Sequence, residues 1–380
     1  MLKRLLIAAL AGLLIGAPLH AQLMMTGVGQ PTNGPGPTFI SQCDYTLGAF
    51  CDSESDTRST TATYYNSSGN IASAAINIAR FDYTGGSAQG WLVEAAATNA
   101  TFPSVVATPS WISGSFATVT NNAATAPDAS SAAAFVVPKS TGGEFVTYAS
   151  TTISGSGTDL FGTIFAAAGT YNYAYVYVVS NDGVHRKGAT FNLTTGAVTQ
   201  NTANTGATGS ASATLAGTYG GKAFYQLSVH LTNNASGSSG FIAFIAAPTG
   251  TVTFSASYLY STSAGDGTSG AYAWGAQMIN AAYTGSYIPT TTAGVTRAAD
   301  TAAGSNWWNG SSGNYLMVES TLESTGVTSR ASYCASGCTS ASAFAPSGVW
   351  IKRICRFSAT PGGATKAQTN AANANGTVCS

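Results

Sequence analysis

The chain has 380 residues, of which only 7% are charged, and its formal net charge is zero. Nucleic-acid binding needs clustered Lys and Arg to neutralise phosphates, and the sequence has no basic stripe, so a nucleic-acid partner is not expected. A hydrophobic fraction of 44%, with 18 Tyr, 16 Phe and 6 Trp, is enough to fill a core and argues against disorder.

The N-terminus, MLKRLLIAALAGLLIGAPLHAQ, has the layout of a secretory signal peptide. Lys3 and Arg4 precede an apolar run over residues 5–15, and a small-residue cleavage pattern follows at 19–21. The run is shorter than the ~20 residues that a membrane-spanning helix needs. We therefore predict a signal peptide over residues 1–21, a secreted, extracellular or virion-surface protein, and no membrane span after signal removal.

The next two segments differ in character. Residues 22–42 are rich in Gly and Pro and lack periodicity, which predicts a linker or an extended arm. Residues 43–100 form a mixed N-terminal segment that contains two compact patterns, ARFDYTGG and GWLVEAAATN. We expect this small segment to precede the main domain.

From residue 101 to about 290, short apolar and aromatic runs follow one another, separated by turn sequences such as SNDG, TTG, APTG and AGDGTSG. Runs such as YNYAYVYVVS, KAFYQLSVHLT and GFIAFIAA have the length and residue types of strands. No convincing helical period occurs after the signal peptide. The pattern predicts an all-β fold, with a jelly-roll β-sandwich over residues 101–290.

The run TYNYAYVYVV alternates strictly between tyrosines and smaller residues. Successive strand residues point to opposite faces, so Ala174, Val176 and Val178 are expected in the core and the tyrosines on the other side. Two interpretations of the tyrosine side stay open. The rings either pack as a structural ladder or against another subunit, or they form a platform on which sugar rings stack. The candidate glycan contacts are Tyr173, Tyr175 and Tyr177, with Trp274 as a fourth that could equally belong to the core.

An even number of cysteines in an exported chain predicts disulfide bonds. The simplest pairing joins near neighbours: Cys43 with Cys51, Cys334 with Cys338, and Cys355 with Cys379. The alternative, a zinc site at CASGC, lacks nearby histidines to complete four ligands.

The stretch WGAQMINAAYTGSYIPTTTAGVTRAAD, Trp274–Asp300, resembles the WGAQLE…SYIPT…TRAAD signature of many phage and prophage tail-associated proteins and exported bacterial relatives. Upstream, RFDYTGGSAQGWLVEAAATN (Arg80–Asn99) resembles that group's RFDYDP…GLLIE…RTN element, so the likeness covers about Thr57 to Asp300. The resemblance implies a jelly roll like that of carbohydrate-binding modules. It also implies a concanavalin- or laminin-G-like region after it.

Several positions depart from the group's pattern. Ile279 follows Met278 where the group usually has Glu after WGAQ-Leu, and Ala97 replaces the Arg of RTN. Residues 291–380 are short for a complete laminin-G-like sandwich, so we expect a second, short β-rich region that bears disulfides. At the end of the signature, Pro289 should direct the chain out of the sheet after Ile288. We expect the side chains of Trp274, Tyr287 and Ile288 to hold this exit against the sandwich. Arg297 and Asp300 could pair across a turn.

No catalytic constellation is evident. Glycoside hydrolysis needs two facing carboxyl groups, and most of the 14 acidic residues stand in turn sequences. Asp128 and Asp266 are candidates for a structural calcium site, although turn formation explains them as well. We therefore expect a non-enzymatic protein with no cofactor beyond that candidate calcium. Its expected partner is a cell-surface or capsular glycan. The alternative is a structural protein that assembles with its own copies or with virion tail components, and a polysaccharide-degrading enzyme is the third hypothesis.

Overall fold

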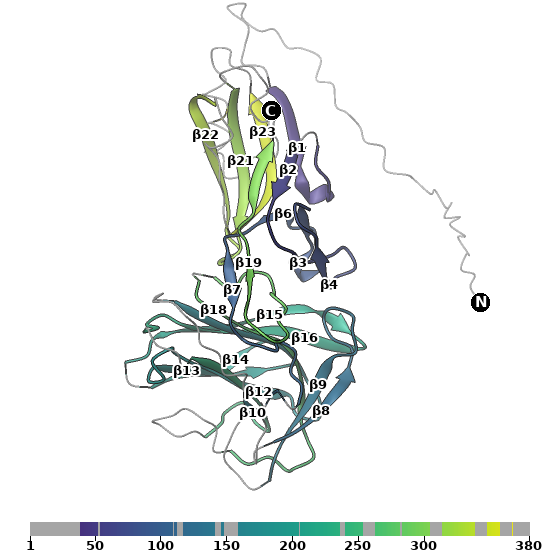
Figure 1. Ribbon diagram of the computed structural model, residues 1–380, viewed down its shortest axis with the longest axis vertical. Helices are drawn as coiled ribbons and strands as arrows, with labels where there is room; N and C mark the ends of the chain where they lie inside the picture. Colours follow the sequence, from purple (N-terminus) through teal and green to yellow (C-terminus); the bar gives the residue numbers. More distant parts are fainter. Residues whose placement is uncertain are drawn as a thin grey trace, which may run out of the picture. The chain divides into compact units, whose positions relative to one another are not determined.

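The computed structural model describes residues 39–51, 54–108, 110–111, 117–140, 146–147, 159–204, 206–235, 240–253, 263–281, 283–304, 314–338, 348–357 and 367. Of residues 39–41, 146–147, 303–304, 314 and 331–338, only the backbone is described. The predicted signal peptide and nearly all of the predicted linker lie outside these ranges. The described chain is almost entirely antiparallel β structure, which confirms the predicted all-β fold (Figure 1).

Two sheets form the predicted sandwich (Figure 1). The first sheet has six strands in the order β15 (Gly209–Tyr219), β16 (Lys222–Leu231), β11 (Leu160–Ala167), β18 (Ala271–Ile279), β9 (Ala133–Pro138) and β8 (Ala117–Ala124). The second sheet has five strands in the order β10 (Val146–Thr147), β17 (Phe241–Ala247), β12 (Tyr173–Val179), β13 (Arg186–Asn192) and β14 (Val198–Ala203). Between β11 and β18 the chain crosses repeatedly from one sheet to the other, as the strands of a jelly roll do.

The inner faces of these two sheets make the largest hydrophobic core. Ile164 and Leu227 from the first sheet pack in one cluster with Val176, Phe191 and Phe244 from the second. Ala174, Val176 and Val178 all belong to this core, as the alternation in β12 predicts. The two sheets approach closely at Gly162, where a Cβ atom would clash with Val178 Cγ2.

β18 differs from the simple alternation that its sequence suggests, because both of its faces are buried. Ala271, Ala273, Ala276 and Met278 face the sandwich core, and Trp274 packs on the opposite side. The inward positions change from odd to even numbers at Gly275, which has a left-handed φ of +62° at an irregularity in the pairing with β11. Such a bulge re-aims the residues that follow it.

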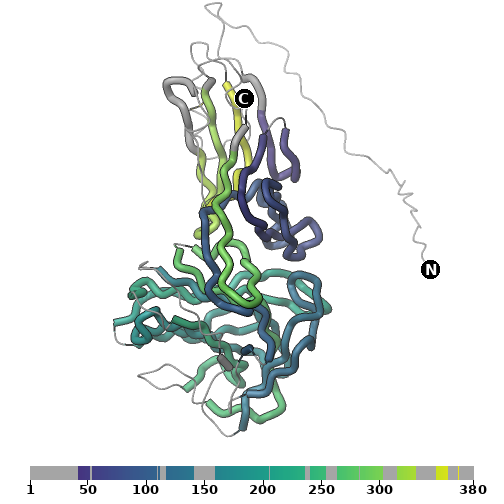
Figure 2. The backbone as a smooth tube through the Cα atoms, in the orientation of Figure 1, coloured from purple at the N-terminus to yellow at the C-terminus, as the bar shows by residue number. Residues whose placement is uncertain are grey.

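A third sheet combines the two ends of the described chain. Its path is β22 (Thr328–Cys338), β21 (Asn314–Leu322), β23 (Val349–Phe357), β6 (Gly90–Val93) and β5 (Arg80–Asp82), and β1 (Phe39–Asp44) also pairs with β23. Figure 2 shows the purple N-terminal segment beside the yellow and green C-terminal strands. The segments 43–100 and 291–380, which the sequence suggests as separate units, therefore contribute strands to one sheet.

Of three further two-stranded ladders, the first two join distant segments and the third is a local hairpin. β2 (Glu54–Thr57) pairs with β20 (Thr301–Gly304), β7 (Ala97–Asn99) pairs with β19 (Val295–Arg297), and β3 (Ala62–Tyr65) pairs with β4 (Ile71–Ala74). Two short 3-10 turns, η1 (Tyr45–Leu47) and η2 (Thr84–Gly86), complete the described elements. The ladders bring the RFDY element and the TRAAD end of the signature to one place.

Candidate functional site

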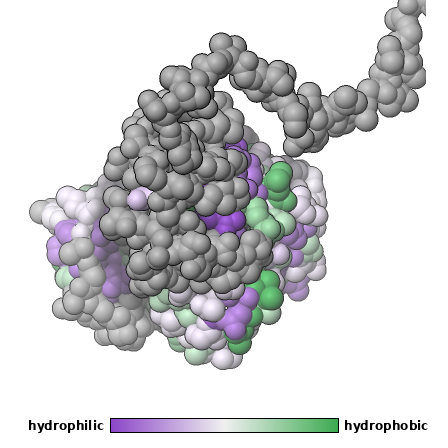
Figure 3. Space-filling view, turned by 90° about the horizontal axis from the view of Figure 1, so that it is seen from above, coloured by the Kyte–Doolittle hydropathy of each residue, from purple (hydrophilic) through white to green (hydrophobic). Residues whose placement is uncertain are grey.

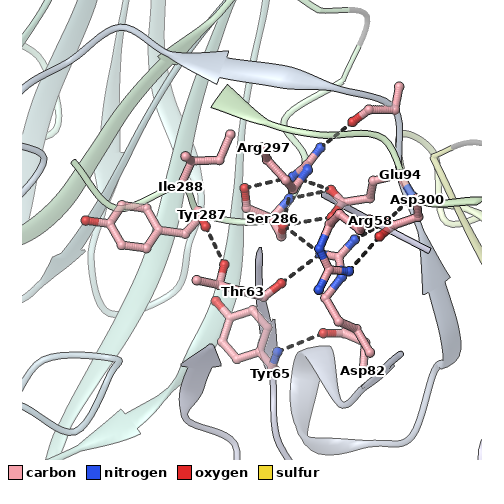
Figure 4. A network of polar contacts seen from close by, with 12 residues as sticks. Arg58, Thr63, Tyr65, Asp82, Glu94, Ser286, Tyr287, Ile288, Arg297 and Asp300 are labelled. Atoms are coloured by element: carbon pink, nitrogen blue, oxygen red, sulfur yellow. Dashed lines mark hydrogen bonds and ion pairs between the residues drawn. The ribbon is translucent and has the colours of Figure 1, made fainter. Parts of the chain in front are cut away.

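Five buried charged residues form an ionic cluster on β5, on β19 and on the segments that flank β2, β6 and β20 (Figure 4). They are Arg58, Arg80, Glu94, Arg297 and Asp300, and their side chains are between 0% and 1% exposed. Arg80 donates to both Glu94 and Asp300. Arg58 Nη1 lies 2.7 Å from Asp300 Oδ1, and Arg297 Nη1 lies 2.9 Å from Glu94 Oε1.

Buried charges need partners at nearly every polar atom. Ser286 supplies several of them, because its backbone N–H and its hydroxyl each donate to Glu94 over 2.7 Å. Burial opposes ionisation of Glu94, but Arg297 and Arg80 outweigh it and lower the pKa of this carboxyl to about 2. Burial also opposes the charge of Arg80, and the neighbouring carboxylates of Glu94 and Asp300 raise its pKa well above the usual range.

The expected pairing of Arg297 with Asp300 is wrong. Arg297 pairs with Glu94, while Asp300 accepts from Arg58 and Arg80. Asp300 also accepts the backbone N–H of Glu94 over 2.7 Å. The two signature residues face different partners because β19 runs beside β7, which directs them toward the RFDY element and not toward each other.

Two buried amides fix the chain where it leaves β18. The Asn99 amide donates to the carbonyls of Ile288 (2.8 Å) and Ala276 (3.3 Å), and Gln277 Oε1 accepts the backbone N–H of Ile288 over 2.7 Å. Trp274, Tyr287 and Ile288 are 1%, 6% and 3% exposed, so all three are buried at this exit as expected. These contacts make the signature a structural junction.

A cavity of about 430 Å³ lies beside the ionic cluster. Its floor is the outer face of the sandwich, where Thr214, Gln226 and Phe165 are cross-strand neighbours on β15, β16 and β11. Ligand sites for small molecules fall in the same range of volumes, roughly 300–1,000 Å³.

The other lining residues combine aromatic rings with polar groups. Tyr64 and Tyr65 come from β3, Trp350 comes from β23, and hydroxyl groups come from Ser324 and Thr325 in the turn between β21 and β22. Rings, hydroxyls and an amide together are the groups that recognise the C–H faces and hydroxyls of sugars.

Two carboxyl groups line the cavity, and they differ in their partners. Asp82 accepts from the backbone N–H of Tyr65 (2.8 Å), from the N–H and hydroxyl of Thr84 and from Trp350 Nε1 (3.0 Å). Burial raises the pKa of Asp82 although these hydrogen bonds oppose the shift. The Asp82 carboxylate therefore holds the cavity wall together.

Glu323 is different, because its buried Oε2 atom accepts no hydrogen bond from the described residues. Burial and the neighbouring carboxylates of Glu94 and Asp82 raise the pKa of Glu323 well above its usual range, although the charges of Arg297 and Arg80 oppose the shift. Neither Glu323 nor Trp350 was predicted as a site residue, since both lie in the C-terminal segment. Strand-like sequence around both residues, NYLMVESTLE and VWIKRIC, indicates strands but says nothing about which residues lie beside their side chains.

The predicted aromatic platform is mostly inaccessible. Tyr175 and Tyr177 are 0% and 2% exposed and pack with Ile245 and Val252, while Tyr173 is only partly buried. Trp274 is 1% exposed and packs against Phe165 and Tyr287. Stacking on a sugar needs an open ring face, which Tyr175, Tyr177 and Trp274 do not offer.

The candidate calcium ligands stand in separate turns. Asp128 Oδ1 accepts from the backbone N–H and hydroxyl of Ser130, and Asp266 Oδ1 accepts from the backbone N–H groups of Thr268 and Ser269. Within the described ranges, no group of three or more His, Cys, Asp or Glu side chains is placed to hold a metal ion. Turn formation accounts for the contacts of both residues.

Cys43 and Cys51 form the predicted disulfide, with a Cα–Cα distance of 5.6 Å. Cys355 is disulfide-bonded as well. The predicted pairings of Cys334 with Cys338 and of Cys355 with Cys379 involve side chains or residues outside the described part. A disulfide is compatible with an extracellular protein, and the described residues include no helix long and apolar enough to cross a membrane.

Together these features define an all-β protein with a two-sheet sandwich, a shared terminal sheet and a cavity lined by rings and hydroxyl groups. No protein-family model matches the chain, and no curated protein matches it either.

Proposed function

We propose that this protein is a non-enzymatic, exported or virion-associated β-sandwich protein of the phage tail type that binds a surface glycan. The observation that carries the proposal is the cavity over the outer face of β15, β16 and β11, where aromatic rings meet hydroxyl and amide groups. This cavity replaces the tyrosine strand as the candidate contact surface, because its rings at Tyr64, Tyr65 and Trp350 are only partly buried.

The carboxyl groups favour binding over hydrolysis. A glycosidase needs two carboxyl groups that act on one bond, either as acid and nucleophile or as acid and base. Among the described lining residues, Asp82 is occupied by its hydrogen bonds, which leaves Glu323 alone. Outside the cavity, Ser180, Asp182 and His185 lie together but do not form a catalytic triad. Asp182 accepts from both Ser180 and His185, so the serine hydroxyl contacts the carboxylate and not the imidazole that would activate it.

The alternative of a purely structural assembly protein has less support. The exposed large hydrophobic side chains of the described residues are few. On the coloured part of the face in Figure 3, hydrophobic residues occupy small areas among polar ones. Large interfaces usually show wider apolar patches.

The mature protein applied to a glycan array, followed by calorimetric titration of each positive glycan, tests the proposal. Tyr64→Ala should weaken binding more than tenfold, since it removes a ring from the cavity without disturbing the ionic cluster. Tyr272→Ala is the matched control, because Tyr272 is also half-buried but does not line the cavity. Stable oligomers without any glycan signal would support the assembly alternative, and new reducing ends after incubation with polysaccharide would support an enzyme.

A further inference from the structure

We infer that the cavity is selective for glycans that carry a free amino group, with the ligand ammonium held by the carboxylate of Glu323. This inference rests on the proposed glycan-binding function and specifies the substrate class of the same site. It follows from the position of Glu323, from the absence of an ion pair to it among the described residues, and from the balance of charges around the cavity.

The backbone holds Glu323 in a defined place at the rim of the third sheet. Its N–H donates to the carbonyl of Gly348 over 2.9 Å. The turn around it is closed by hydrogen bonds from Gly326 N to Leu322 O (2.8 Å) and from Leu322 N to Val327 O (3.0 Å). The carboxyl group lines the cavity from a fixed turn, so a ligand meets it without rearrangement of the chain.

The nearby cations are committed to other partners. Arg80 binds Glu94 and Asp300, and the two Nη atoms of Arg297 donate to Glu94, Ser286 and the carbonyl of Ala95. No ion pair of the described residues includes Glu323. Ionising a buried carboxyl group that has no cationic partner is costly, and an incoming ammonium group would stabilise the carboxylate form.

The charge balance around the cavity points the same way. The ionic cluster together with Asp56, which lies 3.5 Å from Arg58, holds three arginines and three acidic residues, so its charges cancel. Asp82 and Glu323 line the cavity in addition to this balanced set. The surplus consists of two carboxyl groups whose pKa burial raises. An ammonium group beside Glu323 would favour its ionised form, whereas the carboxylates of uronic or sialic acids would oppose it.

The test compares β-1,4-linked glucosamine tetramer with its fully N-acetylated counterpart by calorimetric titration on the full mature chain. The wild-type protein should bind the free amine at least tenfold more tightly. Glu323→Gln keeps the shape of the side chain and removes its charge, so it should abolish this preference. Asp128→Asn, which removes an exposed acid away from the cavity, should keep the preference.

The outcomes separate this inference from the proposed function. If the wild-type protein binds both tetramers equally and Tyr64→Ala weakens both, glycan binding stands and amine selectivity is wrong. A preference that persists in Glu323→Gln, or that Asp128→Asn also removes, reflects general attraction of a polycation and overturns the inference. If neither these tetramers nor any array glycan binds, both the amine selectivity and the proposed glycan-binding function are wrong. Even if Glu323→Gln does not fold, equal binding of the two tetramers by the wild-type protein would overturn the inference.

Discussion

Arg80 joins the two carboxylates of the ionic cluster, Glu94 and Asp300. It bonds two carboxylates, the hydroxyl of Ser286 and the carbonyl of Thr63, and its side chain is completely buried. Removing one member of such a group leaves the others charged and without a partner, which is worse than replacing the whole group by apolar residues.

Arg80→Ala should therefore lower the free energy of unfolding by about 3–5 kcal/mol. Urea denaturation followed by tryptophan fluorescence measures this change. Arg353→Ala is the matched control, because its pair with Asp44 over 3.0 Å is partly exposed and should contribute at most about 1 kcal/mol. Equal losses in the two variants would contradict the role given to the cluster.

Asp56 gives the cluster a pH dependence. Burial and the charge of Asp300 raise the pKa of Asp56 to about 6 from its ordinary 3.8. The folded state therefore holds this proton more tightly than the unfolded state. The resulting stabilisation, about 3 kcal/mol, is fully present below the unfolded pKa and is lost as the pH rises through 6. Glu94 has the opposite sign, because its lowered pKa contributes stability that is lost as the pH falls from 4.5 toward 2.

Asp56→Asn should accordingly flatten the decline in stability between about pH 4 and pH 6.5. The measurement is a series of urea melts across this range for the wild-type protein and the variant. The side chain remains polar and similar in shape, so its packing should change little. A variant that keeps the full wild-type slope would show that another group causes it.

At the scale of the element, β18 depends on the bulge at Gly275. This residue has a φ of +62°, and a Cβ atom there would lie 3.0 Å from the Phe165 ring. Both the backbone conformation and the close contact disfavour a side chain.

Gly275→Ala should lower the free energy of unfolding by about 2–3 kcal/mol, since backbone strain and crowding add. Gly221 separates the two causes, because its φ is +77° but nothing lies within 4 Å of a Cβ atom. Gly221→Ala should cost only about 1 kcal/mol. Thermal unfolding of both variants gives the comparison, and similar losses would mean that the Phe165 contact does not matter.

The strands themselves could be predicted from the sequence because their signals are local. The alternation of β12 places Ala174, Val176 and Val178 in the core, and β18 is recognisable from its residue types. Burial of the opposite faces could not be predicted, because it depends on segments that pack there from elsewhere in the chain. An alternating sequence shows that the two faces of a strand carry different types of side chain, but it does not show that either face is open to solvent.

The candidate site could be predicted only in part for the same reason. Arg80, Glu94, Arg297 and Asp300 all lie in motifs that stand out in the sequence, but Arg58 and Asp300 are 242 positions apart. Their partners follow from the ladders of β2 with β20 and of β7 with β19, which no local pattern specifies. The cavity needs Tyr64, Gln226 and Trp350 at once, so it exists only in the folded chain.

At the scale of the whole molecule, the third sheet makes the two terminal segments depend on each other. β23 lies between β21 and β6 and also pairs with β1. Residues from both ends share one hydrophobic cluster, in which Trp91 packs with Leu316, Val318 and Ile351. The sandwich, by contrast, has its own core between its two sheets.

A chain that ends at residue 313 should therefore lose order at its N-terminal end while the sandwich stays folded. Without β21–β23, the strands β1 and β6 have no partner at one edge, and Trp91 loses the residues that cover it. Limited proteolysis with mass spectrometry should find new cleavage sites within residues 39–96, with peptides from residues 160–247 still protected. Those sandwich peptides are the internal reference. Protection of residues 39–96 in the shortened chain would mean that the N-terminal segment folds without the C-terminal strands, and that the shared sheet does not couple the two ends.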